Sequence, residues 1–334
     1  MAGAQLLASI IIPTYNYANF ICDAIDSVLN SDFPQNQLEI IIIDDGSIDG
    51  TAQRIGIYKN RIKYILQRKA GKAQATKVGI EYAQGRYCFN LDADDLFLSR
   101  KIQQVVNVFE QDRDLVHVAH AAICWEMASN NRQIESIPNV LKGQKVNGKE
   151  LLSYFYRRKM LFGGGSTFAA RTDVLKHIPI SKNVDMLIDE YLILFTLKSG
   201  YSYFIEEPLS IWRIHDKNFS NPTMGISKDN DKMQRNVTSM KLIEDVLQNN
   251  DFPEDVKKLY SLKVKVSIIK AREQLGKKLL SDVFDMWTFF IKNSYLYKRD
   301  LFKIIKSYTL LNRTLPVIIL NLLRKIKYSF SQIG

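Results

Sequence analysis

Short apolar runs in the N-terminal part restrict the possible fold more than any other feature of this sequence. They occupy residues 9–13, 38–43, 61–66, 86–91 and 115–125. Segments with helical spacing separate them, at residues 20–30, 49–57, 73–84 and 99–112. Ser99 is the expected N-cap of the last of these helices. Strands that alternate with single helices predict βαβ units, in which the strands pair in parallel. We therefore expect an α/β fold with a Rossmann-like, mixed but mostly parallel sheet and helices on both faces.

Polar residues follow several of these runs at the point where each predicted strand ends. Tyr15 and Asn16 follow the first run, Asp44 and Asp45 follow the second, and residues 92–95 (DADD) follow the fourth. In open α/β sheets, ligands bind beyond the carboxyl ends of the strands. We therefore expect these segments, although distant in the sequence, to line one crevice.

The segment Asp92-Ala93-Asp94 is the sharpest of these signals. Carboxylates one residue apart, where the chain turns after a buried strand, can hold a hard divalent cation through oxygen ligands. Such a cation neutralises the charge that develops on a departing diphosphate. Taken alone, an acidic cluster of this kind is more often a helix cap or a solvated turn. The apolar strand before it and the helix after it favour the metal site.

Asp45 and Tyr15 each have two interpretations. The Asp45 carboxylate can accept hydrogen bonds from a base or a ribose hydroxyl, or it can belong to an ordinary Asp-Gly turn with Gly46. Tyr15 offers a flat face on which a base can stack, or it can simply pack against the fold. The choice depends on what accompanies them in the rest of the chain.

The three clusters occur together and in order, as residues 10–16 (IIIPTYN), 42–47 (IIDDGS) and 90–95 (NLDADD). In this combination the sequence resembles the family 2 glycosyltransferases, which have the GT-A fold. Further segments match the family: Gly71, Lys72, Ala75 and Gly79; residues 163–166 (GGGS) with Phe168 and Arg171; residues 188–191 (IDEY); and residues 212–215 (WRIH) with Asn218 and Ser220. The resemblance covers residues 8–220, and we place a catalytic domain at residues 1–220.

The resemblance implies an inverting enzyme that moves a sugar from a nucleoside-diphosphate sugar, with a uridine nucleotide favoured, to an acceptor hydroxyl of a glycan or lipid-linked glycan. It assigns donor binding to Pro13, Thr14, Tyr15, Asn16, Asp45, Lys72, Asp92 and Ala93. It assigns a Mg²⁺ or Mn²⁺ ion to Asp94 and His215. The sugar or acceptor would face the loop formed by Gly163, Gly164, Gly165 and Ser166.

The resemblance also implies a catalytic base in the segment at residues 188–191. The family usually has Glu-Asp there, whereas this chain has Asp189-Glu190. Alignment assigns the base to Glu190 with Asp189 in support, and Asp189 remains an alternative. Thr76 and Lys77 stand where the family often has Arg-Asn, which leaves the donor contacts of this predicted helix open.

Charge is distributed unevenly along the chain. Residues 257–334 contain 17 basic and 4 acidic residues, a net charge of +13, so the first 256 residues carry −2 of the total of +11. Apolar and aromatic residues alternate with these cations, as at residues 287–292 and 315–327, which favours amphipathic helices on an anionic membrane surface. The apolar stretch at 315–323 is too short to span a bilayer. A helical cap on the catalytic domain or an oligomer interface is the alternative.

These features define the expected organisation and location. We place a basic, amphipathic helical region at residues 221–334, and the polar stretch at 216–235, where it begins, reads as a linker or flexible loop. The chain has no apolar run of 18 residues and no basic start before its first strand, so we expect neither a transmembrane helix nor a secretory signal. We expect a cytoplasmic protein, peripheral on the inner face of the cell membrane.

Other chemistries find less support. Cys22, Cys88 and Cys124 form no CxxC pair, so we expect reduced thiols rather than a zinc site or a disulfide framework. His117 and His120 lie three apart on one predicted strand and point to opposite faces, which disfavours a shared metal. The chain has no nucleic-acid module. A nucleotidyltransferase would need a glycine-rich phosphate loop after the first strand. A non-catalytic sugar-nucleotide-binding or scaffold subunit stays open as the alternative.

Overall fold

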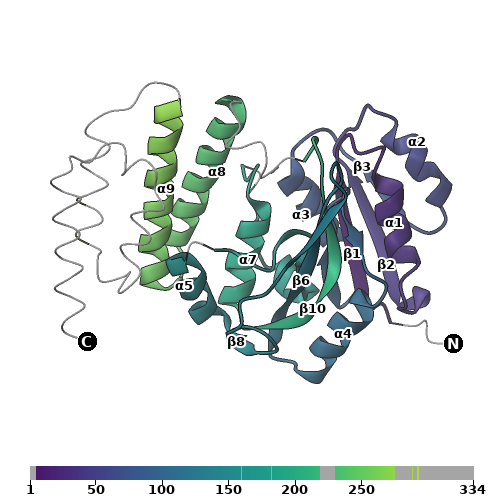
Figure 1. The fold of residues 1–334 in the computed structure, drawn as a ribbon, viewed down its shortest axis with the longest axis horizontal. Coiled ribbons are helices and arrows are strands. Elements are labelled where there is room, and N and C mark those ends of the chain that lie inside the picture. The colour runs from purple at the N-terminus through teal and green to yellow at the C-terminus, as the bar shows by residue number, and fades with distance from the viewer. Residues whose placement is uncertain are drawn as a thin grey trace.

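The computed structural model describes residues 5–158, 160–181, 183–218 and 230–274, together with Thr288 and Lys292. Figure 1 shows a central sheet with α1 and α2 at one end of the molecule and α5, α7, α8 and α9 at the other. The expected amphipathic segments at 287–292 and 315–327 lie almost wholly outside the described residues, as does Ser220.

The N-terminal half forms the expected parallel sheet. Its strands are β1 (Ala8–Thr14), β2 (Leu38–Asp44), β3 (Lys63–Leu66) and β4 (Tyr87–Asn90), and its helices are α1 (Ile21–Leu29), α2 (Thr51–Ile55) and α3 (Lys72–Tyr82). β1 is the centre of this half, because it pairs in parallel with both β2 and β4. Ile10 of β1 lies opposite Ile40 on one side and Phe89 on the other. The strands read as continuous apolar runs because helices cover both of their faces.

The second half adds antiparallel strands, which makes the sheet mixed. Its elements are β5 (Leu96–Phe97), α4 (Lys101–Gln111), β6 (Leu115–Glu126), β7 (Asn131–Glu135), β8 (Lys145–Asn147), α5 (Gly148–Arg158), β9 (Ala169–Arg171), α6 (Thr172–Lys176), α7 (Ile188–Lys198) and β10 (Tyr201–Ile214). The strand order is β3-β2-β1-β4-β9-β6-β10-β5. β9 runs antiparallel to both β4 and β6 and joins the two halves, while β10 pairs with β6 in parallel.

Two apolar cores lie on opposite faces of the sheet. Successive residues of β1 serve different cores: Ile10 and Ile12 pack with α1 and α4, and Ile11 packs with α3, α5 and α7. This alternation follows from the pleat, in which neighbouring side chains point to opposite faces. The prediction of an α/β fold with helices on both faces is confirmed.

The first helices of the basic C-terminal region belong to the same core. α8 (Asn230–Gln248) and α9 (Glu254–Gln274) pack against each other, and α9 packs on α5. Leu247, Val256 and Tyr260 are fully buried in the core that also holds α3, α5 and α7. The predicted linker at 216–235 is wrong at its end, because residues 230–235 are already helical, and residues 219–229 lie outside the described residues.

The start of α4 differs from the sequence-based expectation. α4 begins one residue later than expected, with Arg100 rather than Ser99 at the N-cap position, because the Ser99 hydroxyl donates to Asp32 Oδ2 at 3.1 Å instead. None of the described helices has the length and apolar character needed to cross a membrane. Cys22, Cys88 and Cys124 carry free thiols.

The shared core predicts that α8 unfolds together with the catalytic sheet. Leu247→Ala removes a fully buried side chain and leaves a cavity, so the free energy of unfolding should fall by about 2–4 kcal/mol in a single transition. Leu66→Ala is the control, because Leu66 is 63% exposed and its truncation should change stability by less than about 0.5 kcal/mol. Denaturant titration followed by circular dichroism and tryptophan fluorescence measures both. Two separate transitions would show that α8 and α9 form an independent unit.

Candidate active site

The loops that follow β1, β2 and β4 meet at the carboxyl-terminal edge of the sheet, as predicted. Asn16 has a left-handed backbone, with φ of 61°, and joins the first two loops. Its amide donates to Ser47 Oγ at 2.9 Å, and its side-chain oxygen accepts from the Ile48 amide at 2.9 Å. Pro13 and Thr14 are the last two residues of β1, and both are buried within the edge of the sheet.

Asp45 organises a neighbouring loop. Its carboxylate is 4% exposed and accepts hydrogen bonds from the Gln67 side chain and from the amides of Ala70 and Gly71, at 2.7 to 2.8 Å. Both carboxylate oxygens therefore bind the loop at residues 67–71 rather than facing an open space. Within this loop, Lys69 donates to the Tyr15 hydroxyl at 2.8 Å.

Lys72 joins two distant acidic residues. Its ammonium lies 2.8 Å from Asp92 Oδ1 and 3.2 Å from Asp189 Oδ2. Partial burial lowers the pKa of Lys72, but the Asp189 and Asp92 carboxylates outweigh that effect and hold the pKa above its usual value. The charged ammonium thus holds together the loop after β4, the start of α3 and the start of α7.

Asp94 faces the end of β10. Its carboxylate is 10% exposed, and its Oδ2 lies 3.2 Å from His215 Nε2 and accepts from Asn218 Nδ2 at 2.9 Å. The His215 ring stacks on Phe20, with ring centroids 4.3 Å apart. Burial raises the pKa of Asp94, and the nearby Asp92 carboxylate raises it further.

Arg213 and Tyr17 belong to this site although the sequence analysis assigned them no role. The buried Arg213 guanidinium donates to the Asp94 carbonyl and, at 2.6 Å, to Asp23 Oδ2, so it fastens the acidic loop to α1. Burial raises the pKa of Tyr17, and Asp94 and then Asp92 raise it further, so its phenol stays protonated. Tyr17 lies only two residues after Tyr15, but an aromatic residue near a helix start usually indicates packing.

Ser166 holds the acidic loop at residues 92–95 in place through hydrogen bonds. Its hydroxyl donates to Asp95 Oδ2 at 2.5 Å and accepts from the Asp92 amide at 3.0 Å. Its carbonyl accepts from the fully buried Lys101 ammonium at 2.5 Å. Ser166 thus serves the aspartate loop, whereas the resemblance had assigned it to the sugar or acceptor side.

The glycines before Ser166 lie between the two acidic centres. A Cβ on Gly164 would come within 3.3 Å of Asp189 Cβ, and one on Gly165 would come within 3.6 Å of Asp92 Oδ2. Gly163 has φ of 88°, and a Cβ there would lie 2.7 Å from the buried His117 ring. A side chain at position 163 would therefore clash with His117, and one at position 164 would crowd Asp189, so this loop packs closely against the acidic segments only with glycine at these two positions.

Asp189 and Glu190 lie in the first turn of α7, and their carboxylates contact different parts of the protein. Asp189 lies beside Lys72, with about a third of its side chain exposed. Enclosure by the surrounding protein raises the pKa of Asp189, Lys72 lowers it, and Asp92 raises it. Glu190 is 4% exposed, and its carboxylate accepts from Tyr156 on α5 and from Lys263 on α9.

Asp94 and His215 fit two of the ligands of a divalent cation whose other coordination positions are filled by substrate or water. Their facing atoms are 3.2 Å apart, close to the spacing of two adjacent ligands, each about 2.1 Å from one ion. Among the described residues, no three His, Cys, Asp or Glu side chains gather as a complete metal site. Mg²⁺ is commonly bound by one or two protein ligands together with substrate phosphates and water.

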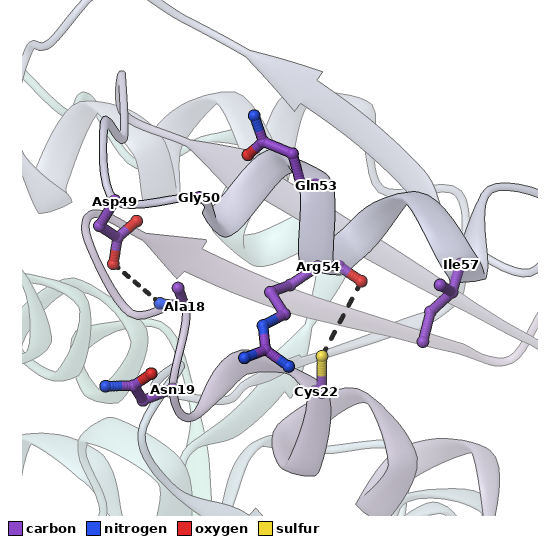
Figure 2. A pocket seen from close by; sticks show the side chains of 8 residues that line it. All are labelled: Ala18, Asn19, Cys22, Asp49, Gly50, Gln53, Arg54 and Ile57. Atoms are coloured by element: carbon purple, nitrogen blue, oxygen red, sulfur yellow. Dashed lines mark hydrogen bonds between the residues drawn. The ribbon is translucent and has the colours of Figure 1, made fainter.

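A separate surface pocket lies between the starts of α1 and α2. Figure 2 shows its lining, in which Asp49 accepts from the Ala18 amide at 3.0 Å and the Cys22 thiol lies 3.9 Å from the Arg54 carbonyl. It contains none of the predicted site residues. The candidate active site is therefore the open, charged edge described above.

Comparisons with known proteins agree with this geometry. Residues 9–178 match the model of glycosyl transferase family 2. An uncharacterized glycosyltransferase of Nostoc sp. is 32% identical over 218 residues, which cover 63% of this chain and 65% of that protein. The chain thus spans slightly less than two-thirds of that relative's length.

Solved structures share the fold. TarS of Staphylococcus aureus, residues 1–349 in complex with UDP-GlcNAc, superposes with a TM-score of 0.58 at 16% identity, over 90% of this chain and 92% of that chain. The mannosyltransferase PcManGT of Pyrobaculum calidifontis, in complex with GDP-Man and Mn²⁺, has a TM-score of 0.54 at 14% identity, over 91% and 84%. Because the family model covers half of the chain and contains the loops after β1, β2 and β4, this protein belongs to glycosyl transferase family 2.

Proposed function

We propose that this protein is an inverting glycosyltransferase that moves a sugar from a nucleoside-diphosphate sugar to a hydroxyl group of a glycan or lipid-linked glycan. The observation that carries the proposal is the Lys72 ammonium that joins Asp92 and Asp189 beside the glycine loop at residues 163–165, next to the Asp94–His215 pair. A UDP-sugar is the proposed donor. The UDP-GlcNAc complex of TarS, which has the same fold, supports this choice.

The donor nucleotide is expected beside Tyr15 and the loop at residues 67–71. Tyr15 offers an aromatic face, and Lys69 contributes a cation 4.0 Å from the centroid of its ring. Asp45 holds this loop in place through its hydrogen bonds to the amides of Ala70 and Gly71. Its contribution to donor binding is therefore to fix the cation-bearing loop.

The diphosphate is expected between Lys72 and Asp94. Asp94 and His215 would hold Mg²⁺ or Mn²⁺, and the ion, when bound, would neutralise charge that develops on the diphosphate. Lys72 adds a fixed positive charge on the other side. Tyr17 can donate a hydrogen bond there because its raised pKa keeps the phenol protonated.

Asp189 is the proposed catalytic base. Its carboxylate pairs with Lys72 and about a third of its side chain is exposed, whereas Glu190 is buried against Lys263. In one displacement, the acceptor oxygen bonds to the anomeric carbon, the bond to the diphosphate breaks with its electron pair, and the acceptor proton moves to Asp189. A raised pKa makes the ionised carboxylate a stronger base.

The two acidic residues of α7 should behave differently on substitution. Asp189→Asn keeps the shape but removes the proton acceptor, so turnover should fall about 10²–10⁴-fold while nucleotide affinity is retained. Glu190→Gln is the comparison variant; its loss should be smaller, about tenfold, because it disturbs only the ion pair with Lys263 that positions Asp189 and leaves the proton acceptor in place. Single-turnover assays and calorimetric titration of the nucleotide measure both quantities. An inactive Glu190→Gln beside an active Asp189→Asn would assign the base to Glu190.

Removal of the metal should weaken donor binding through Asp94. Wild-type protein should bind a nucleoside diphosphate more tightly with Mn²⁺ than with chelator, by about tenfold or more, because the ion bridges protein and phosphate. Asp94→Asn should lose this difference, and Asp49→Asn, in the separate surface pocket, should keep it. Isothermal titration calorimetry provides the measurement. Equal affinity and turnover of the wild type in chelator would disprove the metal requirement.

The basic C-terminal region is proposed to dock on an anionic membrane surface at the inner face of the cell membrane. Each basic residue near such a surface contributes about 1 kcal/mol, and salt screens the attraction beyond about 8–10 Å. The full chain should co-sediment with anionic vesicles more than with neutral ones, and less at high salt. Truncation after residue 274 should remove most of this binding. Unchanged binding, or equal binding to both vesicle types, would favour a packed helical cap or an oligomer interface instead.

A further inference from the structure

Glu190 anchors the start of α7 to α5 and α9. The Lys263 ammonium of α9 donates to both Glu190 carboxylate oxygens, at 2.5 and 2.7 Å. The Tyr156 hydroxyl of α5 donates to Glu190 Oε1 at 2.7 Å. With 4% of Glu190 exposed, the carboxylate is held almost entirely by these two partners.

Aromatic rings surround this ion pair. The ring of Tyr260, also on α9, lies 5.5 Å from the ring of Tyr156, and the Lys263 ammonium lies 5.3 Å from the Tyr260 ring centroid. Burial raises the pKa of both tyrosines, and Glu190 raises it further, so both phenols remain neutral. Because Glu190 is buried while 37% of the Lys263 side chain is exposed, the loss of Lys263 would leave a buried, unpaired carboxylate, which is unfavourable.

The segment that begins α7 needs such support. Leu187, directly before the helix, has a left-handed backbone with φ of 64°, and no side chain caps the helix. A leucine persists in this conformation only where its surroundings hold it. The Met186 amide provides a second link, because it donates to Ser239 Oγ of α8 at 3.1 Å.

Asp189 lies on the same helical turn, one residue before Glu190. Successive residues of an α-helix are rotated by about 100° and move as a rigid unit. Glu190 therefore faces α9 while Asp189 faces Lys72, and a shift of this turn away from α9 would displace Asp189 from Lys72 and Gly164.

We infer that Lys263 is a positioning residue for the reaction: through Glu190 it sets the orientation of Asp189. The inference rests on the proposed role of Asp189 as the base. It gives a helix beyond the family match at residues 9–178 a part in catalysis, because α9 supplies the cation that fixes the first turn of α7.

Lys263→Met tests the inference against a purely stabilising role. Its kcat should fall about tenfold or more, since small displacements of a reacting group slow the reaction strongly, while KM for the donor stays unchanged. Lys263→Arg, which keeps the charge and the hydrogen bonds, should restore most of kcat. If Lys263→Met does not fold, Lys263→Gln, which keeps one hydrogen-bond donor, takes its place.

Arg157→Met is the matched control. Arg157 of α5 pairs with Asp255 of α9 at 2.7 Å, so its loss weakens the attachment of α9 to α5 without touching Glu190. It should lower the melting temperature and leave kcat of the folded protein unchanged. If Lys263→Met behaves in the same way, with reduced stability but normal kcat, the positioning role is disproved.

Hydrogen–deuterium exchange tests the link without any turnover. The first turn of α7, residues 188–191, should exchange faster in Lys263→Met and at the wild-type rate in Arg157→Met. Unchanged exchange of this turn in Lys263→Met would overturn the inference even if the wild type proved inactive. Absence of turnover in the wild type with every donor would instead count against the proposed function.

Discussion

The structure depends on holding the carboxylates of Asp92, Asp94 and Asp95 close together where water is scarce. Burial raises the pKa of Asp95 well above its ordinary value, and the other two carboxylates add to the effect. Such a cluster is stable only when donors and cations surround it. Ser166 donates to Asp95 at 2.5 Å, and the backbone amide of Arg213 donates to it at 3.1 Å.

Each of these supports comes from a different part of the chain, which explains much of the architecture. Ser166 reaches the cluster because β9, directly after its loop, pairs with β4 in antiparallel. Arg213 reaches it from the end of β10, and Lys72 from the start of α3. The neutralising groups therefore come from both halves of the sheet: from the loop before β9, from β10 and from the start of α3.

Lys72 divides the proposed site into a donor side and a side that carries the proposed base. It separates Asp92, on the donor side, from Asp189, the proposed base, and it contacts both. A cation in this position would attract the diphosphate while it keeps a large part of Asp189 ionised. The glycines at 164 and 165 lie close beside Asp189 and Asp92. The helices α5, α8 and α9, packed behind α7, then determine how rigidly Asp189 is held.

The sequence by itself determined the parallel half of the sheet and the position of the site. Continuous isoleucine runs such as residues 40–43 can only be buried on both faces, and polar residues after such strands must meet at one edge. The pairing of Asp94 with His215 was also expected from the resemblance. Short strands such as β9, with only Ala169–Arg171, carry too little pattern to be recognised from the sequence.

Only the tertiary structure decided which carboxylate of α7 faces the site. Asp189 and Glu190 are adjacent acids, and their spacing gives no direction in space. The direction of each carboxylate follows from its partner: Asp189 pairs with Lys72, and Glu190 pairs with Lys263. These two lysines are 191 residues apart in a sequence with many similar basic residues. Asp45 is a similar case, because its partners Ala70 and Gly71 become neighbours only when β2 and β3 pair. A pattern of residue types specifies local structure and burial, but the partner of a charge depends on how distant elements pack.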